Sequence, residues 1–440
     1  VCTDETIEAV SALFAEKGSN AWFEMDAADI LPKGFACPHC GKSAGFTKEE
    51  DTLDGWFDSG STHFAAMKKD QGFWPATMYL EGLDQYRGWF QSSLLTAVGA
   101  FGEGAPFKEC VTHGWTVDGE GRAMHKSLGN GVDPADIFNE NGADILRLWA
   151  ASADYHADVR CSKAIFQQLS QNYLKFRNTC KFMLDNLVDF DPAHLTKAED
   201  MPVLDRWLIT KLNELIEKVE QSYNDYEFHI ITHAVNDFCV TTLSSFYLDI
   251  VKDRLYCEAA DSAERRSAQT ALYLTLSTLA KLFAPILAFT CDEIWLAMPH
   301  TAEDDARNVV LNDMNKPFTA YALDAETMAR WEHIIEVRTA VNGALEEARA
   351  AKVIGKSLEA DVHLTVPEGD VFLADENPAA LADLFIVSKV ELTVGGELAV
   401  KVENAAGTKC PRCWKHSLTP NAEGLCPRCA EVVRHLPDLL

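Results

Sequence analysis

The spacing of apolar residues along the chain changes near residue 160 and separates two kinds of structure. Before that point, residues 77–82 and 107–114 form short apolar runs of the type found in strands. Residues 84–101 between them repeat their apolar side chains at the helical spacing. A strand, a helix and a second strand in this order predict one parallel βαβ crossover.

The carboxyl ends of the two predicted strands are the expected place for a ligand. Ligands of open parallel sheets bind beyond these ends, where Glu81, Gly82, His113 and Gly114 stand in the sequence. We therefore expect these four residues to contribute to a binding site. For Glu81 a second interpretation stays open, because its position equally fits a cap for the following helix.

Residues from about 160 to 350 repeat their apolar side chains at the helical spacing and predict a helix bundle. One apolar stripe consists of Ile165, Leu169, Tyr173, Phe176, Cys180, Met183 and Leu187, and a second consists of Leu204, Leu208, Leu212, Leu215 and Val219. Beyond the bundle, residues 361–366 and 384–394 alternate between apolar and polar positions. This change of period predicts a small mixed α/β unit.

Length and composition fit a globular protein of several domains. The chain has 440 residues, of which 47% are hydrophobic and 24% charged, and this length predicts roughly two to four domains. No apolar run approaches the about 18 residues that a membrane span requires, and the first residues lack the layout of a secretion signal. We therefore expect a cytoplasmic protein without membrane contact. Because Val1 lies inside an amphipathic helical pattern, we also expect a piece of a longer chain.

The formal net charge of −28 argues against a protein that coats nucleic acid, because non-specific affinity for phosphate comes from Lys and Arg. Any contact with RNA must therefore be local. The last forty residues reverse the trend, with the basic residues Lys401, Lys409, Arg412, Lys415, Arg428 and Arg434 against four acidic ones. Such a surplus indicates either a polyanion-binding surface or a solvated face.

Six of the thirteen cysteines form three Cys-x-x-Cys pairs. Two of these pairs, Cys410/Cys413 and Cys426/Cys429, are close enough in sequence to surround one tetrahedral Zn²⁺. We expect a structural zinc there, since four protein ligands leave no open coordination position for a reacting water. The third pair, Cys37 and Cys40, is only half of such a site, and its missing partner pair either precedes Val1 or does not exist.

Trp414 directly follows the predicted zinc ligand Cys413 and stands close to Arg412. An exposed Trp beside basic side chains is able to stack on an unpaired RNA base. We therefore predict that Trp414 and Arg412 bind RNA. Each Cys-x-x-Cys pair with its turn is called a knuckle below. Packing of Trp414 against the small knuckle of Cys410 and Cys413 is an equally open interpretation.

Seven segments in order, DTLDGWFDSGST, YLEGLDQYRGWF, THGWTVDGEG, MHKSLGN, GADILRLW, SSFYLDIVKDRLY and the terminal CPRCW, resemble the bacterial-type isoleucyl-tRNA synthetases, a family of class I aminoacyl-tRNA synthetases. The resemblance covers essentially all 440 residues. It implies a multidomain α/β plus α protein that corresponds to the carboxyl-terminal half of the enzyme. The implied domains are the end of the insertion that carries the editing domain (1–48), the second half of a Rossmann-type catalytic core (49–155), a helical anticodon-binding domain (156–345), a small α/β junction domain (346–404) and a zinc-binding tail (405–440).

The reaction implied by the resemblance joins isoleucine to ATP, with Mg²⁺, and transfers it from isoleucyl-adenylate to tRNA(Ile), in a monomeric enzyme. The His-x-Gly-His signature of the family is missing from this sequence, so we expect the chain to be inactive alone. An alternative from a different class is a non-catalytic RNA-binding polypeptide derived from a synthetase.

Residues 121–130 (GRAMHKSLGN) resemble the second signature loop of the family, Lys-Met-Ser-Lys-Ser. Lys126 matches the second, catalytic lysine, and the resemblance implies that Lys126, Ser127 and Met124 bind ATP together with His113 and Gly114. Ala123 and His125 replace the first lysine and the serine of the signature. Because of these replacements, it is open whether positions 123 and 125 make further contacts with phosphate.

The resemblance also implies which residues hold the adenylate. Glu81 matches the residue that binds isoleucyl-adenylate, next to Gly82, and Asp84 and Gln85 at the following helix start fit further substrate contacts. Trp56 and Trp89 are candidates for the walls of the isoleucine pocket.

Overall fold

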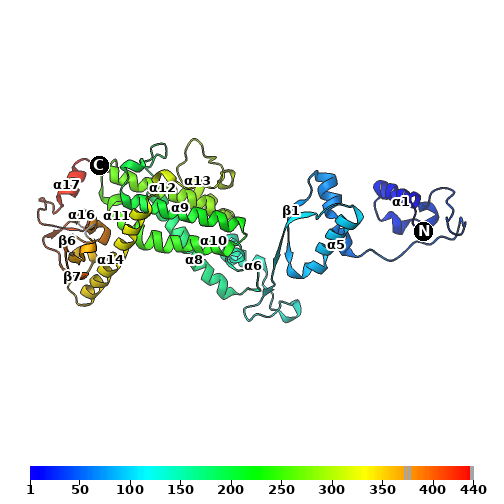
Figure 1. The fold of residues 1–440 in the computed structure, drawn as a ribbon, viewed down its shortest axis with the longest axis horizontal. Coiled ribbons are helices and arrows are strands. Elements are labelled where there is room, and N and C mark those ends of the chain that lie inside the picture. Colours follow the sequence, from blue (N-terminus) through cyan, green and yellow to red (C-terminus); the bar gives the residue numbers. More distant parts are fainter. Residues whose placement is uncertain (371–372, 374–377, 437–440) are drawn as a thin grey trace. The chain divides into compact units, whose positions relative to one another are not determined.

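The computed structural model describes residues 1–370, 373 and 378–436 (Figure 1). The chain divides into two compact units, Val1–His113 and Gly114–Leu440, which are described separately. The division lies inside residues 49–155, the segment predicted as part of a catalytic core. None of the helices in the described ranges combines the length and apolar composition that a bilayer crossing requires.

The first unit begins with three short helices, α1 (Asp4–Lys17), α2 (Ala21–Glu24) and α3 (Ala27–Ile30). Thr3 and Thr6 form a capping box at the start of α1, which satisfies amide groups that the helix itself leaves unpaired. After an irregular stretch the chain continues into α4 (Gly55–Gly60) and a π-helix (His63–Gln71).

The predicted βαβ crossover is confirmed. Strands β1 (Ala76–Gly82) and β2 (Phe107–His113) pair in parallel, and helical segments connect them: a 3-10 helix (Leu83–Arg87), α5 (Trp89–Leu95) and a π-helix (Thr96–Ala100). The expectation of one continuous helix over 84–101 was wrong, because Gly88 has backbone angles (φ −98°, ψ −132°) that no α-helix accommodates.

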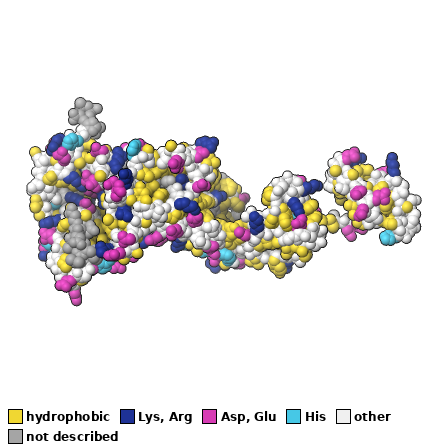
Figure 2. Space-filling model, turned by 45° about the horizontal axis from the view of Figure 1, so that its top comes forward, with side chains coloured by type: hydrophobic (Ala, Val, Ile, Leu, Met, Phe, Trp, Pro, Cys, Tyr) yellow, Lys and Arg dark blue, Asp and Glu magenta, His cyan; other side chains and the backbone are white. Residues whose placement is uncertain are grey.

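The connection between β1 and β2 leaves many apolar side chains at the surface, and Figure 2 shows them gathered on this part of the chain. Leu80 of β1 is exposed, and so are Leu83, Tyr86, Leu94, Leu95 and Val98 of the connection. Parallel sheets are normally covered on both faces. Two strands with exposed apolar neighbours are therefore what one expects of part of a larger α/β core.

The second unit begins with a small region around two parallel two-residue strands, β3 (Thr116–Val117) and β4 (Val159–Arg160). Between them lie a 3-10 turn (Lys126–Leu128), α6 (Pro134–Asn141) and α7 (Ala143–Ser152). A buried cluster of Ile137, Ile145, Cys161 and Phe166 holds these elements together.

The predicted helix bundle is confirmed. It consists of α8 (Lys163–Asp185), α9 (Val203–Asn224), α10 (Phe228–Asp237), a π-helix (Phe238–Tyr247), α11 (Leu248–Cys257), α12 (Ala263–Phe283), α13 (Ala288–Ala297) and α14 (Ala325–Ala350), with short 3-10 turns at Ala198–Asp200, Val309–Leu311 and Thr319–Tyr321. The second predicted stripe, on α9, is buried along its whole length. The first stripe, on α8, is buried from Phe176 onward and partly buried before it.

A buried carboxylate fixes α11 within the bundle. Asp205 on α9 accepts hydrogen bonds from Tyr247 Oη (2.8 Å), Ser267 Oγ (2.5 Å) and Arg254 Nη1 (3.2 Å). Burial raises the pKa of Asp205, against the opposing effect of Arg254 and the two hydroxyl donors. Since these donors come from three segments, the network sets the position of α11 relative to its neighbours.

The mixed α/β unit beyond the bundle is also confirmed. Its sheet has the order β6-β5-β7, with β5 (Ala360–Val366) parallel to β6 (Lys389–Val394) and antiparallel to β7 (Ala399–Asn404). Helix α16 (Pro378–Phe385) precedes β6, and 3-10 turns lie at Ser357–Glu359 and Glu368–Asp370. The tail contains β8 (Thr408–Lys409), β9 (His416–Ser417) and α17 (Pro427–Arg434).

Candidate functional site

The carboxyl ends of β1 and β2 meet, as the parallel register requires. Glu81 pairs with Thr112, and Gly82 pairs with His113. Glu81 is partly buried, and its carboxylate lies 3.4 Å from the Gly82 amide. There is little room for a side chain at Gly82, because an added Cβ would lie 2.8 Å from Asp84 Oδ1.

Gln85 and Asp84 follow directly and contact each other. Gln85 Nε2 donates to Asp84 Oδ2 at 3.1 Å. The other end of the amide, Gln85 Oε1, is buried without a hydrogen-bond partner. A buried carbonyl oxygen without a donor is costly, so a donor group of a bound molecule would be stabilised there.

Trp56 and Trp89 lie on two helices that cross closely. At the crossing, an added Cβ on Gly60 of α4 would be 2.6 Å from Ser92 Cβ of α5. Trp56 is 44% exposed, whereas Trp89 packs on Tyr79 of β1 with ring centroids 4.8 Å apart. Trp89 is therefore fixed by the sheet, and Trp56 offers an open aromatic face.

The lysine loop in the second unit is held at both ends. Before it, a hairpin turn is closed by the Asp118 amide, which donates to Arg122 O at 2.9 Å, and by the Val117–Ala123 bridge. After it, the Asn130 side chain donates to Asp118 Oδ2 (2.9 Å) and Ala123 O (3.1 Å) and accepts from the His125 amide (2.9 Å). The bond from Asn130, together with the Arg122 amide, lowers the pKa of Asp118 well below its usual range.

Lys126 and Ser127 project from this anchored frame. Both are exposed, and Lys126 begins the 3-10 turn that ends at Gly129 in the left-handed region (φ 60°). Met124 packs against the buried Ile137 cluster, so it roots the loop in the core. The anchoring role of Asn130 was not predicted from the sequence. The residue type could have indicated it, since Asn readily bonds to nearby backbone in turns.

Gly114 lies where two backbone segments touch. Its amide donates to Tyr155 O at 2.8 Å, and an added Cβ would lie 2.4 Å from Ala157 O. Only glycine allows this approach.

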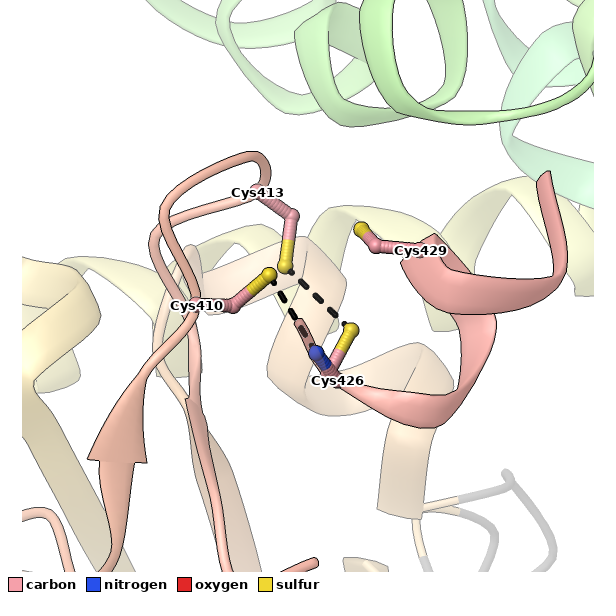
Figure 3. Close-up of side chains that lie close together, drawn as sticks. All are labelled: Cys410, Cys413, Cys426 and Cys429. Atoms are coloured by element: carbon pink, nitrogen blue, oxygen red, sulfur yellow. Dashed lines mark hydrogen bonds between the residues drawn. The ribbon is translucent and has the colours of Figure 1, made fainter. Parts of the chain in front are cut away.

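The four tail cysteines come together as predicted (Figure 3). Their sulfur atoms all lie within 4.8 Å of one another, and Cys413 Sγ is 3.7 Å from Cys426 Sγ. Tetrahedral zinc with Zn–S bonds of about 2.3 Å requires sulfur separations of about 3.8 Å, so the site fits zinc. Burial opposes ionisation of Cys410, but backbone donors at Cys413, Cys426 and Arg412 outweigh it and lower its pKa to about 6.

The Cys37 pair has the same knuckle turn as the Cys410 pair. The Gly41 amide donates to Cys37 O (2.8 Å) and the Cys37 amide to Lys42 O (2.8 Å); the corresponding bonds at Trp414 and Cys410 are both 2.9 Å. Among the residues that the structure describes, however, only the tail cysteines form a group of three or more metal-binding side chains. The Cys37 pair thus has the knuckle turn, but no second cysteine pair lies beside it within the described ranges.

Trp414 occupies the position that Gly41 occupies in the first knuckle. Its φ is +64°, a conformation that is unfavourable for a bulky residue. The indole is 54% exposed, with Lys356 Nζ 5.5 Å from its centroid. More than half of the Trp414 surface is therefore open to solvent.

The basic side chains near Trp414 face other parts of the same chain. Arg412 donates to Tyr256 O at 3.3 Å and to Cys257 O. Lys415 pairs with Asp383, and Arg428 pairs with Asp253. Lys401, Lys409 and Arg434 also pair with acidic side chains of the chain. All six basic residues that made the tail look like a polyanion-binding surface thus have intrachain partners.

Comparison with known proteins defines the class of the chain. Residues 1–162 match the family model of class I tRNA synthetases (I, L, M and V), and residues 205–364 match the anticodon-binding domain of tRNA ligases. The chain belongs to the class I tRNA synthetases.

Within that class the similarity is to isoleucine–tRNA ligases. The isoleucine–tRNA ligase of Carboxydothermus hydrogenoformans is 48% identical over 100% of this chain, and that of Moorella thermoacetica is 46% identical over 99%. The chain spans about half the length of these relatives, 49% in both cases. The family is therefore that of the isoleucine–tRNA ligases.

The chain is also similar to a solved structure, and this similarity concerns the fold only. The agnB2 LeuRS of Agrobacterium radiobacter K84, in a ternary complex with tRNA and LeuAMS, aligns with a TM-score of 0.52 at 16% identity. The alignment covers 84% of this chain and 38% of that one.

Proposed function

We propose that this chain supplies the carboxyl-terminal half of an isoleucine–tRNA ligase. The complete enzyme activates isoleucine with ATP and Mg²⁺ and transfers it from isoleucyl-adenylate to tRNA(Ile). The identity of 48% to such a ligase over the whole chain carries the proposal. The exposed apolar side chains around β1 and α5 support it, because further strands and helices would cover them. By the same resemblance we place the enzyme in the cytoplasm, as a monomer.

Lys126 is the proposed catalytic residue. Adenylate formation moves negative charge onto the leaving pyrophosphate, and a lysine that contacts it strengthens its interaction in the transition state. The anchored but exposed loop supports this role, because it presents Lys126 and Ser127 to solvent on a fixed base. Met124 would contribute by anchoring the loop to the buried Ile137 cluster. The backbone near His113 and Gly114 would contact ATP.

Glu81, with Gly82, Asp84 and Gln85, is proposed to bind the adenylate. A carboxylate suits the cationic amino group of isoleucine or a ribose hydroxyl, and the partnerless Gln85 Oε1 would accept from a further donor. Trp89 and Trp56 would form walls of the isoleucine pocket. An apolar pocket distinguishes side chains by only about 1–3 kcal/mol per methylene, which fits a family with a separate editing domain.

The tail is proposed to hold one structural zinc and to stack Trp414 on an unpaired base of tRNA. The left-handed backbone of an exposed Trp supports this role, since unfavourable conformations are kept where they serve a function. Arg412 would contribute by fixing the knuckle that presents the indole.

Isoleucine-dependent exchange between pyrophosphate and ATP tests the proposal in a complete ligase that contains this chain. We expect exchange in the complete enzyme and none with the chain alone. Binding of tRNA without exchange in the complete enzyme would favour the alternative, an RNA-binding polypeptide derived from a synthetase.

A further inference from the structure

Both tail knuckles contain the dipeptide Pro-Arg, and both arginines reach the same helix end. Arg412 lies between Cys410 and Cys413, and Arg428 lies between Cys426 and Cys429. Their guanidinium groups contact the last turn of α11 and the residue after it. The two halves of the cysteine site therefore share one docking surface on the helix bundle.

Arg428 makes the stronger contact. Its Nη1 and Nη2 donate to Asp253 Oδ2 (2.5 Å) and Oδ1 (2.8 Å), and Nη1 also donates to Glu258 Oε1 (2.8 Å). Paired parallel bonds between guanidinium and carboxylate are both strong and geometrically specific. The side chains of Arg428 and Asp253 are 33% and 21% exposed, so solvent screens them only in part.

Arg412 caps α11. It donates to the carbonyl oxygens of Tyr256 and Cys257, which have no partner within the helix. A cation at this end also complements the negative end of the helix dipole. Cys257 returns a contact, with its Sγ 3.8 Å from Arg412 O.

The cysteine site links the two arginines. Arg412, from the first knuckle, lies with Nη1 3.7 Å from Cys429 Sγ of the second knuckle. The sulfur atoms of both knuckles converge within 4.8 Å, and the buried Cys257 packs with them. Both guanidinium groups therefore reach α11 from knuckles that the cysteine site brings together.

We propose that the two knuckle arginines form a clamp that converts zinc binding into docking of the tail on α11. The inference rests on the proposed zinc site and is independent of ligase activity. Docking sets the position of Trp414 and forms part of the wall of an open pocket of about 510 Å³ between α11, α16 and the tail, lined by Lys252, Tyr256, Trp414 and Lys415. Lys415, paired with Asp383 on α16, adds a third attachment.

Tryptic cleavage after Lys409, at the base of the tail, reports docking in the full chain. In the zinc-loaded protein we expect slow cleavage, and after removal of zinc by a chelator at least a tenfold faster rate. Arg428→Ala should cleave as fast as the zinc-free protein while it keeps one zinc per chain. Arg434→Ala is the matched control, because Arg434 lies on the same helix and pairs only locally with Glu431.

Asp253→Asn tests the clamp from the other side without altering the tail. We expect it to retain zinc and to accelerate cleavage, whereas Asp249→Asn on the same helix, where Asp249 pairs with Lys252, should not. Zinc-loaded Asp253→Asn with the cleavage rate of the wild type would overturn the clamp, as would a rate that chelation leaves unchanged. Absence of zinc from the wild-type protein would instead contradict the proposed metal site.

Discussion

Asn130 and Asp118 bond to each other across the base of the lysine loop, with Asn130 Nδ2 2.9 Å from Asp118 Oδ2. Through the same side chain Asn130 also holds Ala123 O and the His125 amide. The residues before and after Lys126 thus share one anchor.

Asn130→Ala should therefore lower the turnover of the complete ligase about tenfold, equivalent to about 1.4 kcal/mol of transition-state stabilisation. Isoleucine binding should change little, because only the loop loses its anchor. Kinetics of pyrophosphate exchange would measure both parameters. Asn130→Asp should not restore the rate, since it places a carboxylate against Asp118; full activity in that variant would contradict an anchoring role.

Lys126→Ala should lower the turnover about a hundredfold, with isoleucine binding nearly unchanged. Loss of one charged contact made in the transition state costs on the order of 3 kcal/mol. Lys163→Ala is a suitable control, because Lys163 is a solvent-exposed lysine of the same unit that pairs with Glu140. A normal turnover for Lys126→Ala would contradict the assignment of Lys126 as the catalytic residue. The role would then fall to His125 or to a residue outside this chain.

The sequence predicted those features whose signal is local. Helical spacing and short apolar runs predicted the bundle and the βαβ crossover, and ligand spacing predicted the cysteine cluster. Features outside these local patterns were not predicted: the backbone angles of Gly88 interrupt the predicted helix, and the Asn130 side chain bonds to the Asp118 side chain across an intervening loop. The partners of Arg412 and Arg428 could not be predicted from sequence patterns either, because they lie 155 and 175 residues away in the chain.

Cys426→Ser should abolish zinc binding and unfold the tail, while the helix bundle stays folded. Small knuckles have too little core to fold without their metal, whereas the bundle has an extensive core of its own. Metal analysis and circular dichroism would measure the two effects. Cys110→Ser, at an exposed cysteine outside the tail, should keep one zinc per chain. Zinc retained at full occupancy by Cys426→Ser would exclude this ligand set.

Trp414→Ala in the zinc-loaded ligase should weaken tRNA binding by roughly 1–3 kcal/mol, the usual loss when a base-stacking aromatic is removed. Trp414→Phe keeps an aromatic face and should retain most of the affinity. Filter binding or fluorescence titration would measure both. Equal affinities for the Ala variant and the wild type would leave the tail with an architectural role only.

Acid should destabilise the bundle through Asp189. The Arg265 side chain, which donates to Asp189 Oδ2 at 2.6 Å, lowers the pKa of this carboxyl to about 2. Because the folded pKa lies below the unfolded value of about 3.9, this contribution to stability is complete above the unfolded pKa and is lost as pH falls toward 2. Urea midpoints measured from pH 5 to pH 2 should therefore decrease.

Arg265→Ala should make the same decrease shallower, since Asp189 then titrates closer to its ordinary pKa. Arg307→Ala provides the contrast. Arg307 is 80% exposed and pairs with Asp305 two residues away, a local contact that the unfolded chain can also form. An unchanged pH profile in the Arg265 variant would show that other carboxylates control the acid transition.

The clamp on α11 also has a consequence for the order of folding. Arg412 meets Cys257 across 155 residues of chain, so the docking surface is synthesised long before the arginines that occupy it. Domains fold largely as units during synthesis, the earlier ones first, and the end of α11 must therefore wait without its cap until the tail appears. With the proposed clamp, attachment of the tail would be one of the last steps of folding, and it would require both translation of the two knuckles and binding of the metal.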